Sequence, residues 1–276
     1  MAKFGIMQGR LVPPEDGRLQ SFPLERWRDE FALAKAAGLD YIEWIYDAYG
    51  LGANPILEPK GISALLDLKQ QTGVALRSMC ADYFMDFPLL RCTAEECSAR
   101  LDRLFQLIDA AEQLGMNRIV LPFVDASAMN TEDEIESVVK ALRVALPFAR
   151  KSGIELHLEA SLSPKAFASF LQRIPDPMLK VNYDSGNSAS LGYSVKEEFA
   201  AYGKVVGSIH IKDRKRGAST VPLGTGDAEL TGLAECVREV QYKGDFTLQV
   251  ARGTAGEEVA WAKQNLSYTK NLLHIE

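Results

Sequence analysis

Short runs of apolar and β-branched residues alternate along the chain with longer segments whose apolar residues recur at helical spacing. Eight of the short runs have the length and composition of β-strands. These predicted strands are Phe4–Met7, Tyr41–Ile45, Ala75–Cys80, Arg118–Pro122, Ile154–Glu159, Leu179–Asp184, Val206–Ile211 and Phe246–Ala251. The clearest predicted helices are Leu24–Ala37, Ile62–Thr72, Thr93–Leu114 and Thr131–Ser152. A glycine follows each of these four helices directly, as is typical of helix C-termini.

This alternation of strands and helices predicts the α/β class, with parallel strands joined by crossover helices. Eight such units in 276 residues match a closed (β/α)8 TIM barrel. An open doubly wound sheet would carry a glycine fingerprint after its first strand, and the segment Gln8–Pro13 lacks that spacing. No linker divides the chain, and 47% hydrophobic residues suffice for one large core. Residues 1–276 are therefore expected to form a single barrel domain.

Polar and apolar residues alternate within several of the predicted strands. The segment Ile154–Glu159 alternates isoleucine and leucine with two glutamates and a histidine, and Val206–Ile211 and Phe246–Ala251 show a similar pattern. Because successive side chains of a strand point to opposite sides, the apolar set is expected under the helices and the polar set inside the barrel. A polar interior is costly unless its groups are hydrogen-bonded or bound to a metal. The pattern therefore indicates a barrel interior adapted to chemistry.

Four consecutive strands each carry a metal-capable side chain at or near their downstream end: Glu159, Asp184, His210 and Gln249. Active sites of such barrels lie at the C-terminal ends of the strands. Oxygen and imidazole ligands suit one divalent ion, with Mn, Mg, Co and Zn all compatible. A single acidic residue at a strand end is often only a cap for the next helix. Four candidates in consecutive strands on the same face favour a metal site.

The sequence around these residues resembles the xylose-isomerase-like barrels. The resemblance covers nearly the whole chain and is carried by the Glu159 strand and by four further motifs, Tyr183–Ala189, His210–Asp213, Pro222–Asp227 and Tyr242–Gln249. That superfamily comprises sugar isomerases, sugar and sugar-phosphate epimerases, inosose-type dehydratases and endonuclease IV. The most similar branch is that of the sugar-phosphate and ketohexose 3-epimerases. The resemblance implies that Glu159, Asp184, His210 and Gln249 hold the metal.

The resemblance further implies an isomerase or epimerase that acts on a sugar or sugar phosphate through an enediolate, with Glu159 as the base. Relatives carry a second glutamate where this chain has Gln249, and an amide cannot carry a proton at neutral pH. Three alternatives follow. Glu159 acts alone, which also suits a metal-dependent dehydratase (a lyase) of a polyol or keto-sugar; Glu43 or Asp82 replaces the second base; or the protein is a non-catalytic sugar-binding relative.

Further residues are expected to contact the substrate. Asn187 is assigned to sugar hydroxyls or to the cap of the helix after the sixth strand. His157, one pleat before Glu159, is either a residue that supports the site or a buried polar contact. Lys212, Arg214 and Arg216 follow His210 on a loop above the predicted metal, and their charge suits a phosphorylated sugar; Lys212 and Arg216 are assigned to the substrate.

Three other positions leave two interpretations open. Glu43, at the end of the second strand, is assigned to substrate binding or to the second base. Its neighbour Trp44 would form a sugar-stacking wall or, by strand parity, a core contact under a helix. The segment Gly224–Gly226 forms either a simple turn or a phosphate contact through its backbone N–H groups.

The composition limits the kinds of partner. A net charge of −6 disfavours nucleic acid, and three histidines are too few for the metal cluster of a DNA-repair relative. No apolar run approaches the roughly 20 residues of a membrane span, and Met1–Ile6 lacks the core of a signal peptide. Four cysteines without framework spacing indicate reduced thiols in a cytoplasmic protein. A small-molecule sugar is the expected partner, and a homodimer is possible.

Overall fold

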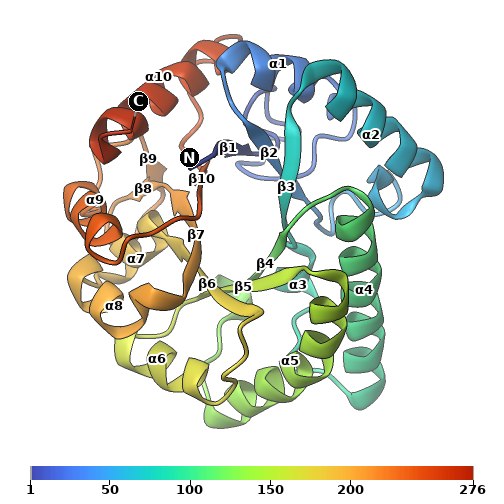
Figure 1. Cartoon of the computed structure of the whole chain (residues 1–276), viewed down its shortest axis with the longest axis vertical. Coiled ribbons are helices and arrows are strands. Elements are labelled where there is room, and N and C mark those ends of the chain that lie inside the picture. Colours follow the sequence, from blue (N-terminus) through green and yellow to red (C-terminus); the bar gives the residue numbers. More distant parts are fainter. Residues whose placement is uncertain (1, 276) are drawn as a thin grey trace.

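A ring of helices surrounds a closed barrel of parallel strands in the computed structural model, which describes residues 2–275 (Figure 1). The barrel strands are β1 (Phe4–Met7), β2 (Tyr41–Ile45), β3 (Ala75–Cys80), β4 (Arg118–Phe123), β5 (Glu155–Ala160), β6 (Leu179–Asp184), β7 (Val206–Ile211) and β10 (Asp245–Leu248). Neighbours around the barrel follow the order β1-β10-β7-β6-β5-β4-β3-β2, so the first and last barrel strands pair and close it. The predicted (β/α)8 fold class is confirmed.

The helices mostly connect successive strands. They are α1 (Asp29–Ala37), α2 (Pro59–Thr72), α3 (Tyr83–Asp86), α4 (Ala94–Gln113), α5 (Glu132–Ser152), α6 (Pro164–Gln172), α7 (Ser185–Leu191), α8 (Val195–Tyr202), α9 (Leu230–Glu239) and α10 (Glu258–Leu273). Short 3-10 turns are η1 (Pro55–Leu57), η2 (Asp125–Ser127) and η3 (Gly203–Val205), and an antiparallel hairpin is formed by β8 (Asp213–Arg214) and β9 (Thr220–Val221). Across residues 2–275, none of these helices has both the length and the apolar character needed to cross a membrane.

Three predicted boundaries were wrong by three or more residues. Residues 24–28 form turns instead of helix, and α1 begins at Asp29, whose N–H donates to the carbonyl of Arg26 at 3.0 Å. The second helix, α2, begins at Pro59 and not at Ile62. The last barrel strand ends at Leu248, so Gln249 follows the strand, although its N–H still donates to Ile211 O at 3.0 Å. The long helices begin as predicted, because Thr93 and the corresponding threonine of α5 each form a capping box with a glutamate three residues later.

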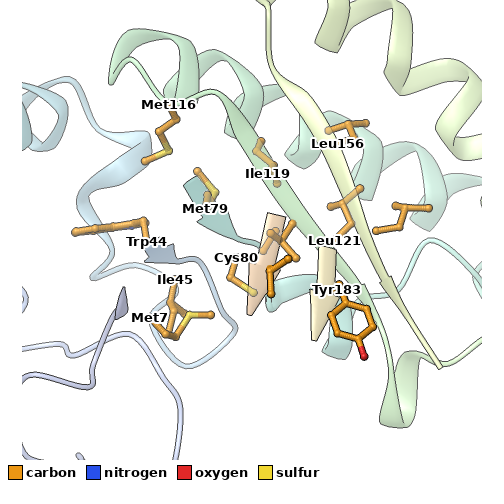
Figure 2. Close-up of a cluster of buried hydrophobic side chains, with 14 of the residues drawn as sticks. Met7, Trp44, Ile45, Met79, Cys80, Met116, Ile119, Leu121, Leu156 and Tyr183 are labelled. Carbon is orange, nitrogen blue, oxygen red and sulfur yellow. The ribbon is translucent and has the colours of Figure 1, made fainter. Parts of the chain in front are cut away.

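Apolar side chains on the outer faces of the strands pack under the helices and form the core. Met79, Ile119 and Leu156 pair across β3, β4 and β5, and all three are buried (Figure 2). Trp44 also belongs to this core: it is fully buried, and its ring lies 5.5 Å from that of Phe22. The structure therefore supports the core interpretation of Trp44 and not the sugar-stacking wall.

Polar side chains fill the barrel interior, as the strand alternation predicts. At the N-terminal end, Arg118 Nη1 lies 2.8 Å from Asp245 Oδ2, and its Nη2 donates to Tyr41 Oη at 3.2 Å. Arg77 binds the same carboxylate at 2.8 Å. Tyr41, Arg118 and Asp245 are the first residues of β2, β4 and β10, and Arg77 belongs to β3. Together these side chains close the N-terminal end of the barrel. The opposite end, where the strands finish, is left for the candidate site.

Candidate active site

Three metal-capable side chains meet near the C-terminal ends of adjacent strands. Glu159 on β5, Asp184 on β6 and His210 on β7 each offer one ligand atom, and these atoms all lie within 4.8 Å of one another. Asp184 and His210 are partners in the register of β6 and β7, which explains why their side chains share the interior face. All three residues are buried. Two carboxylates and one imidazole are a suitable donor set for a divalent cation.

The histidine is oriented by a third acid, Glu43, from the far side of the barrel. His210 Nε2 lies 2.6 Å from Glu43 Oε1, while Nδ1 lies 3.3 Å from Glu159 Oε2 and 3.9 Å from Asp184 Oδ2. Burial disfavours the charge of His210, yet the carboxylates of Glu43 and Glu159 outweigh burial and raise its pKa to about 10. A cation bound at Nδ1 would take the place of that proton, so the crowded acids fit a metal site.

Glu43 lies beneath the site and not at its surface. Its side chain is fully buried, and its carboxylate accepts from Ser78 Oγ at 2.5 Å as well as contacting His210. Burial opposes ionisation, but His210 is the strongest of several favourable contacts, and together they lower the pKa of Glu43 to about 2. The predictions that Glu43 binds substrate or serves as the second base are therefore wrong. Its contacts suit a residue that fixes the ring of His210.

A cavity of about 500 Å³ opens above the group of ligands. Its walls combine acidic, cationic and amide side chains from several strand ends, among them Gln20, Asp82, Glu159, Asn187, Lys212 and Gln249. Glu159 belongs both to the group of ligands and to the cavity wall. A small polar molecule held in this cavity would therefore touch the carboxylate that the sequence predicts as the base.

Gln249, the predicted fourth ligand, is engaged with a lysine. Lys212 Nζ lies 3.3 Å from Gln249 Oε1, 3.3 Å from Asn187 Oδ1 and 3.4 Å from Asp184 Oδ2. The other end of the amide, Gln249 Nε2, donates to Gln20 Oε1 at 2.9 Å. Lys212 thus reaches the site as the sequence predicts, and it places a positive charge beside the carboxylates. Metal ligation by Gln249 remains a prediction.

Two asparagines hold the carboxylate of Glu159. Asn182 Nδ2 donates to Oε2 at 2.8 Å, and Asn187 Nδ2 donates to Oε1 at 2.5 Å. Asn187 therefore lies at the cavity. Its predicted role as a helix cap is wrong, because the cap of α7 is Asp184, whose Oδ1 accepts from Asn187 N at 2.7 Å. Asn182 was missed by the sequence analysis. Its position two residues before Asp184, on the same strand face, was the signal that could have identified it.

His157 lies one layer deeper than the ligands. Its Nδ1 contacts Ser208 Oγ at 2.7 Å, its Nε2 contacts Glu155 Oε2 at 2.9 Å, and the ring is fully buried. Burial outweighs the effect of Glu155 and lowers the pKa of His157 to about 4, so the ring is neutral near pH 7. Ser208 connects it to the site by donating to Asn182 Oδ1 at 2.6 Å. The predicted substrate contact of His157 is wrong, and the ring supports the site from below.

The basic segment after His210 forms the β8–β9 hairpin. Arg214 lines the cavity, and its Nη1 donates to Asn187 Oδ1 at 2.8 Å. The expected cationic loop therefore reaches the cavity at Arg214. Arg216 lies beyond the end of β8, in the turn of the hairpin, where it is exposed and lies against Gly192 at the end of α7, outside the cavity lining. The predicted substrate contact of Arg216 is wrong, because the chain turns away from the cavity after Arg214.

The glycine segment of the next loop is a turn and not a phosphate cradle. Asp213 Oδ2 accepts from Gly224 N and from Gly226 N, both at 2.9 Å, and Asp213 Oδ1 accepts from Ala228 N at 3.0 Å. A Cβ atom at Gly226 would lie 2.0 Å from Asp213 Oδ1, so the close approach requires glycine there. The carboxylate of Asp213 already occupies the N–H groups that a phosphate would need.

The chain is thus a (β/α)8 barrel with a candidate metal centre, a Glu–Asp–His group beside a polar cavity at the C-terminal ends of the strands. The family model described as xylose isomerase-like TIM barrel matches residues 31–272. The chain belongs to this family, and the predicted resemblance is confirmed.

Similarity to individual proteins points in the same direction. The chain is 25% identical over 248 residues to L-ribulose-5-phosphate 3-epimerase UlaE of Salmonella paratyphi A, with 86% of each chain covered. A solved structure of L-ribulose 3-epimerase matches 99% of this chain and 95% of its own, with a TM-score of 0.78 and 16% identity. A structure of IOLI protein with a binding zinc atom covers 98% of each chain, with a TM-score of 0.76 and 16% identity. The names of the two epimerases agree with the predicted enzyme class.

Proposed function

We propose that the chain is a divalent-metal-dependent isomerase or epimerase of a ketose or ketose phosphate. The observation that carries the proposal is the group of Glu159, Asp184 and His210, whose ligand atoms lie within 4.8 Å of one another beside an open cavity. Similarity to a sequence named L-ribulose-5-phosphate 3-epimerase supports the substrate class. The predicted sugar partner and the predicted metal are thus part of one hypothesis.

A divalent ion held by Glu159, Asp184, His210 and Gln249 would polarise the substrate carbonyl and make the neighbouring C–H acidic. Glu159 takes that proton as the general base and leaves an enediolate. Both oxygens of its carboxylate accept hydrogen bonds from asparagine amides, which hold the group at the cavity wall. The ring of His210 keeps its orientation because its second nitrogen contacts Glu43 at 2.6 Å.

The cationic part of the cavity favours a phosphorylated substrate. Lys212 and Arg214 line the cavity on the side of Asn187, and Arg18 also contributes to the wall. Guanidinium and ammonium groups are the usual partners of phosphate oxygens. The phosphate of a ketose phosphate would then lie at the β8–β9 hairpin, with the carbonyl end directed toward Glu159.

A metal-dependent dehydratase of a polyol or keto-sugar is the second candidate. The observation that favours it is Gln249, which cannot carry the second proton of a two-base epimerisation. A dehydratase needs the same metal and one base. It would release water from the substrate, which an epimerase does not.

Metal content tests the foundation of both candidates. Protein purified without chelator should contain about one divalent ion per chain, and a Glu159→Ala/His210→Ala variant should lose it. The matched control is Glu155→Ala/His157→Ala, which removes a second Glu–His pair at 2.9 Å, with a buried histidine and a half-buried glutamate, outside the ligand group. Equal metal in the parent and in the Glu159→Ala/His210→Ala variant would exclude the proposed centre.

Substrate turnover then separates the two candidates. The parent protein is incubated in deuterated water with L-ribulose, L-ribulose 5-phosphate and related ketoses. An isomerase or epimerase incorporates deuterium at the reacting carbon and yields a product of unchanged mass apart from the label. A product lighter by one water would identify the dehydratase instead.

A further inference from the structure

A second carboxyl group lines the same cavity as Glu159. Asp82 lies two residues after the end of β3, and its Oδ2 accepts from Gln20 Nε2 at 2.7 Å. Its Oδ1 accepts from the thiol of Cys80 at 3.1 Å. Within residues 2–275, no lysine, arginine or histidine nitrogen forms an ion pair with Asp82. Nothing therefore holds this carboxyl in its charged form by direct pairing.

Gln20 connects this carboxyl to the residue that replaces the usual second glutamate. Gln20 Nε2 donates to Asp82, and Gln20 Oε1 accepts from Gln249 Nε2 at 2.9 Å. Arg10 Nη2 donates to the same Gln20 oxygen at 3.1 Å, which further fixes the amide. The chain of hydrogen bonds places Asp82 on the Gln249 side of the cavity, where the second proton carrier is missing.

Other acids of the cavity wall do not suit proton transfer. Asp47 is committed to the backbone, because its carboxylate accepts from Phe22 N at 2.9 Å and from Gly50 N at 2.7 Å. Asp86 and Asp125 are exposed at the rim. Asp82 is half-buried, and burial raises its pKa to about 6, a value suited to a group that both gives and takes a proton near neutral pH.

We propose that Asp82 is the second proton carrier of the reaction, a role that Gln249 cannot fill. This inference rests on the proposed isomerase or epimerase function and specifies it as a two-base 3-epimerisation. It assigns the catalytic pair to Glu159 and Asp82, which come from different strand ends and face one cavity.

The proton balance is complete without a further reactant. Glu159 removes the proton from the substrate carbon next to the carbonyl, and the electrons of the C–H bond form the enediolate. The neutral carboxyl of Asp82 then gives its proton to the other face of that carbon, and the carbonyl forms again. Glu159 ends protonated and Asp82 ionised, and exchange with water in the open cavity restores both. In the reverse direction the two groups exchange roles.

Separating hydrogen exchange from inversion tests this assignment. The parent, Asp82→Asn and Asp102→Asn are incubated with L-ribulose and L-ribulose 5-phosphate in deuterated water, and proton NMR follows two quantities. One is the loss of the C3 proton from the starting sugar, and the other is the formation of the 3-epimer. Asp102→Asn makes the same chemical change at an exposed position of α4, outside the cavity lining.

Asp82→Asn should form the 3-epimer at least about 100-fold more slowly, because a general acid or base contributes roughly 10²–10⁴ in rate. It should still incorporate deuterium into the starting sugar through Glu159, which also shows that the variant is folded. Asp102→Asn should retain both rates of the parent.

Four results would overturn the assignment. They are epimer formation by Asp82→Asn within tenfold of the parent rate, loss of exchange together with inversion in that variant, an equal loss in Asp102→Asn, and a parent that exchanges without inverting. The last result leaves Glu159 as a single base and keeps the isomerase function. A parent that neither exchanges nor inverts these sugars would instead contradict the proposed function, and the Asp82 assignment with it.

Discussion

The contact between Glu43 and His210 offers a measurable test of how the candidate metal centre is built. Glu43→Gln keeps the shape of the side chain and an oxygen that can accept from His210 Nε2, but it removes the negative charge that lies 2.6 Å from that nitrogen. Both residues are fully buried, so water cannot replace the lost charge. The imidazole should then be held less firmly and be a weaker donor to a metal at Nδ1.

The size of the effect follows from the kind of hydrogen bond. Bonds to a charged partner contribute about 1.5–3 kcal/mol, and neutral bonds contribute about 0.5–1.5 kcal/mol. Losing the difference, about 1.4 kcal/mol, weakens metal binding roughly tenfold. Partners of metal-binding histidines typically change affinity by about 10–100-fold. We therefore expect the Kd for Mn²⁺ or Zn²⁺ to rise at least about tenfold in Glu43→Gln.

Isothermal titration calorimetry of chelator-stripped protein measures this Kd. Glu155→Gln is the matched control, since it makes the same change beside His157 at 2.9 Å, and that histidine lies outside the ligand group. Metal binding by Glu155→Gln should stay within about twofold of the parent, well below the range for a ligand's partner. A parental Kd in Glu43→Gln, or an equal loss in both variants, would refute the reasoning.

Three further predictions concern stability and the metal centre. Asp245→Asn leaves the charge of Arg118 buried without its partner, which should lower the free energy of unfolding by about 3–5 kcal/mol and the calorimetric Tm by about 6–10 °C. The control Glu235→Gln changes an exposed ion pair and should shift the Tm by less than about 2 °C. Gln249→Glu adds a carboxylate near the predicted metal and should lower the Kd for Mn²⁺ several-fold in isothermal titration calorimetry. An unchanged Kd would place residue 249 outside the set of metal ligands. Burial raises the pKa of Glu30 from 4.5 to about 8. Between pH 4.5 and about pH 8 the folded state therefore binds more protons than the unfolded state, and the stability of the fold decreases as the pH rises through this range. Glu30→Gln removes this pH-dependent loss of stability. In urea unfolding, the free energy of unfolding of Glu30→Gln minus that of the parent should rise from pH 5 to pH 8. A difference that stays constant over this range would contradict the shifted pKa.

The fold and the principal candidate ligands could be predicted because they depend on local rules. Strand parity decides which side chains enter the barrel, and the direction of parallel strands decides which end they reach. Glu159, Asp184 and His210 satisfy both rules, and the structure brings them together. Lys212 and Asn187 follow these strands directly, so their approach to the site was also within reach of the sequence.

The arrangement across the barrel could not be predicted. Glu43 on β2 and His210 on β7 are not neighbours in the barrel order, and only closure of the barrel brings them to 2.6 Å. Sequence spacing carries no information on such contacts, so Glu43 was assigned to the substrate when it lies under the histidine. The hairpin after β7 likewise decided that Arg214, and not Arg216, faces the cavity.

The sequence alone predicts a (β/α)8 barrel, the end of the barrel that carries the site, and a glutamine at position 249 where the family resemblance implies a proton carrier. The surroundings of that glutamine come from the folded chain, which brings Lys212 to its oxygen and Gln20 between its nitrogen and Asp82. The physical reason is that periodicity and chain direction act within one strand, whereas contacts between strand ends depend on closure and on loop conformation.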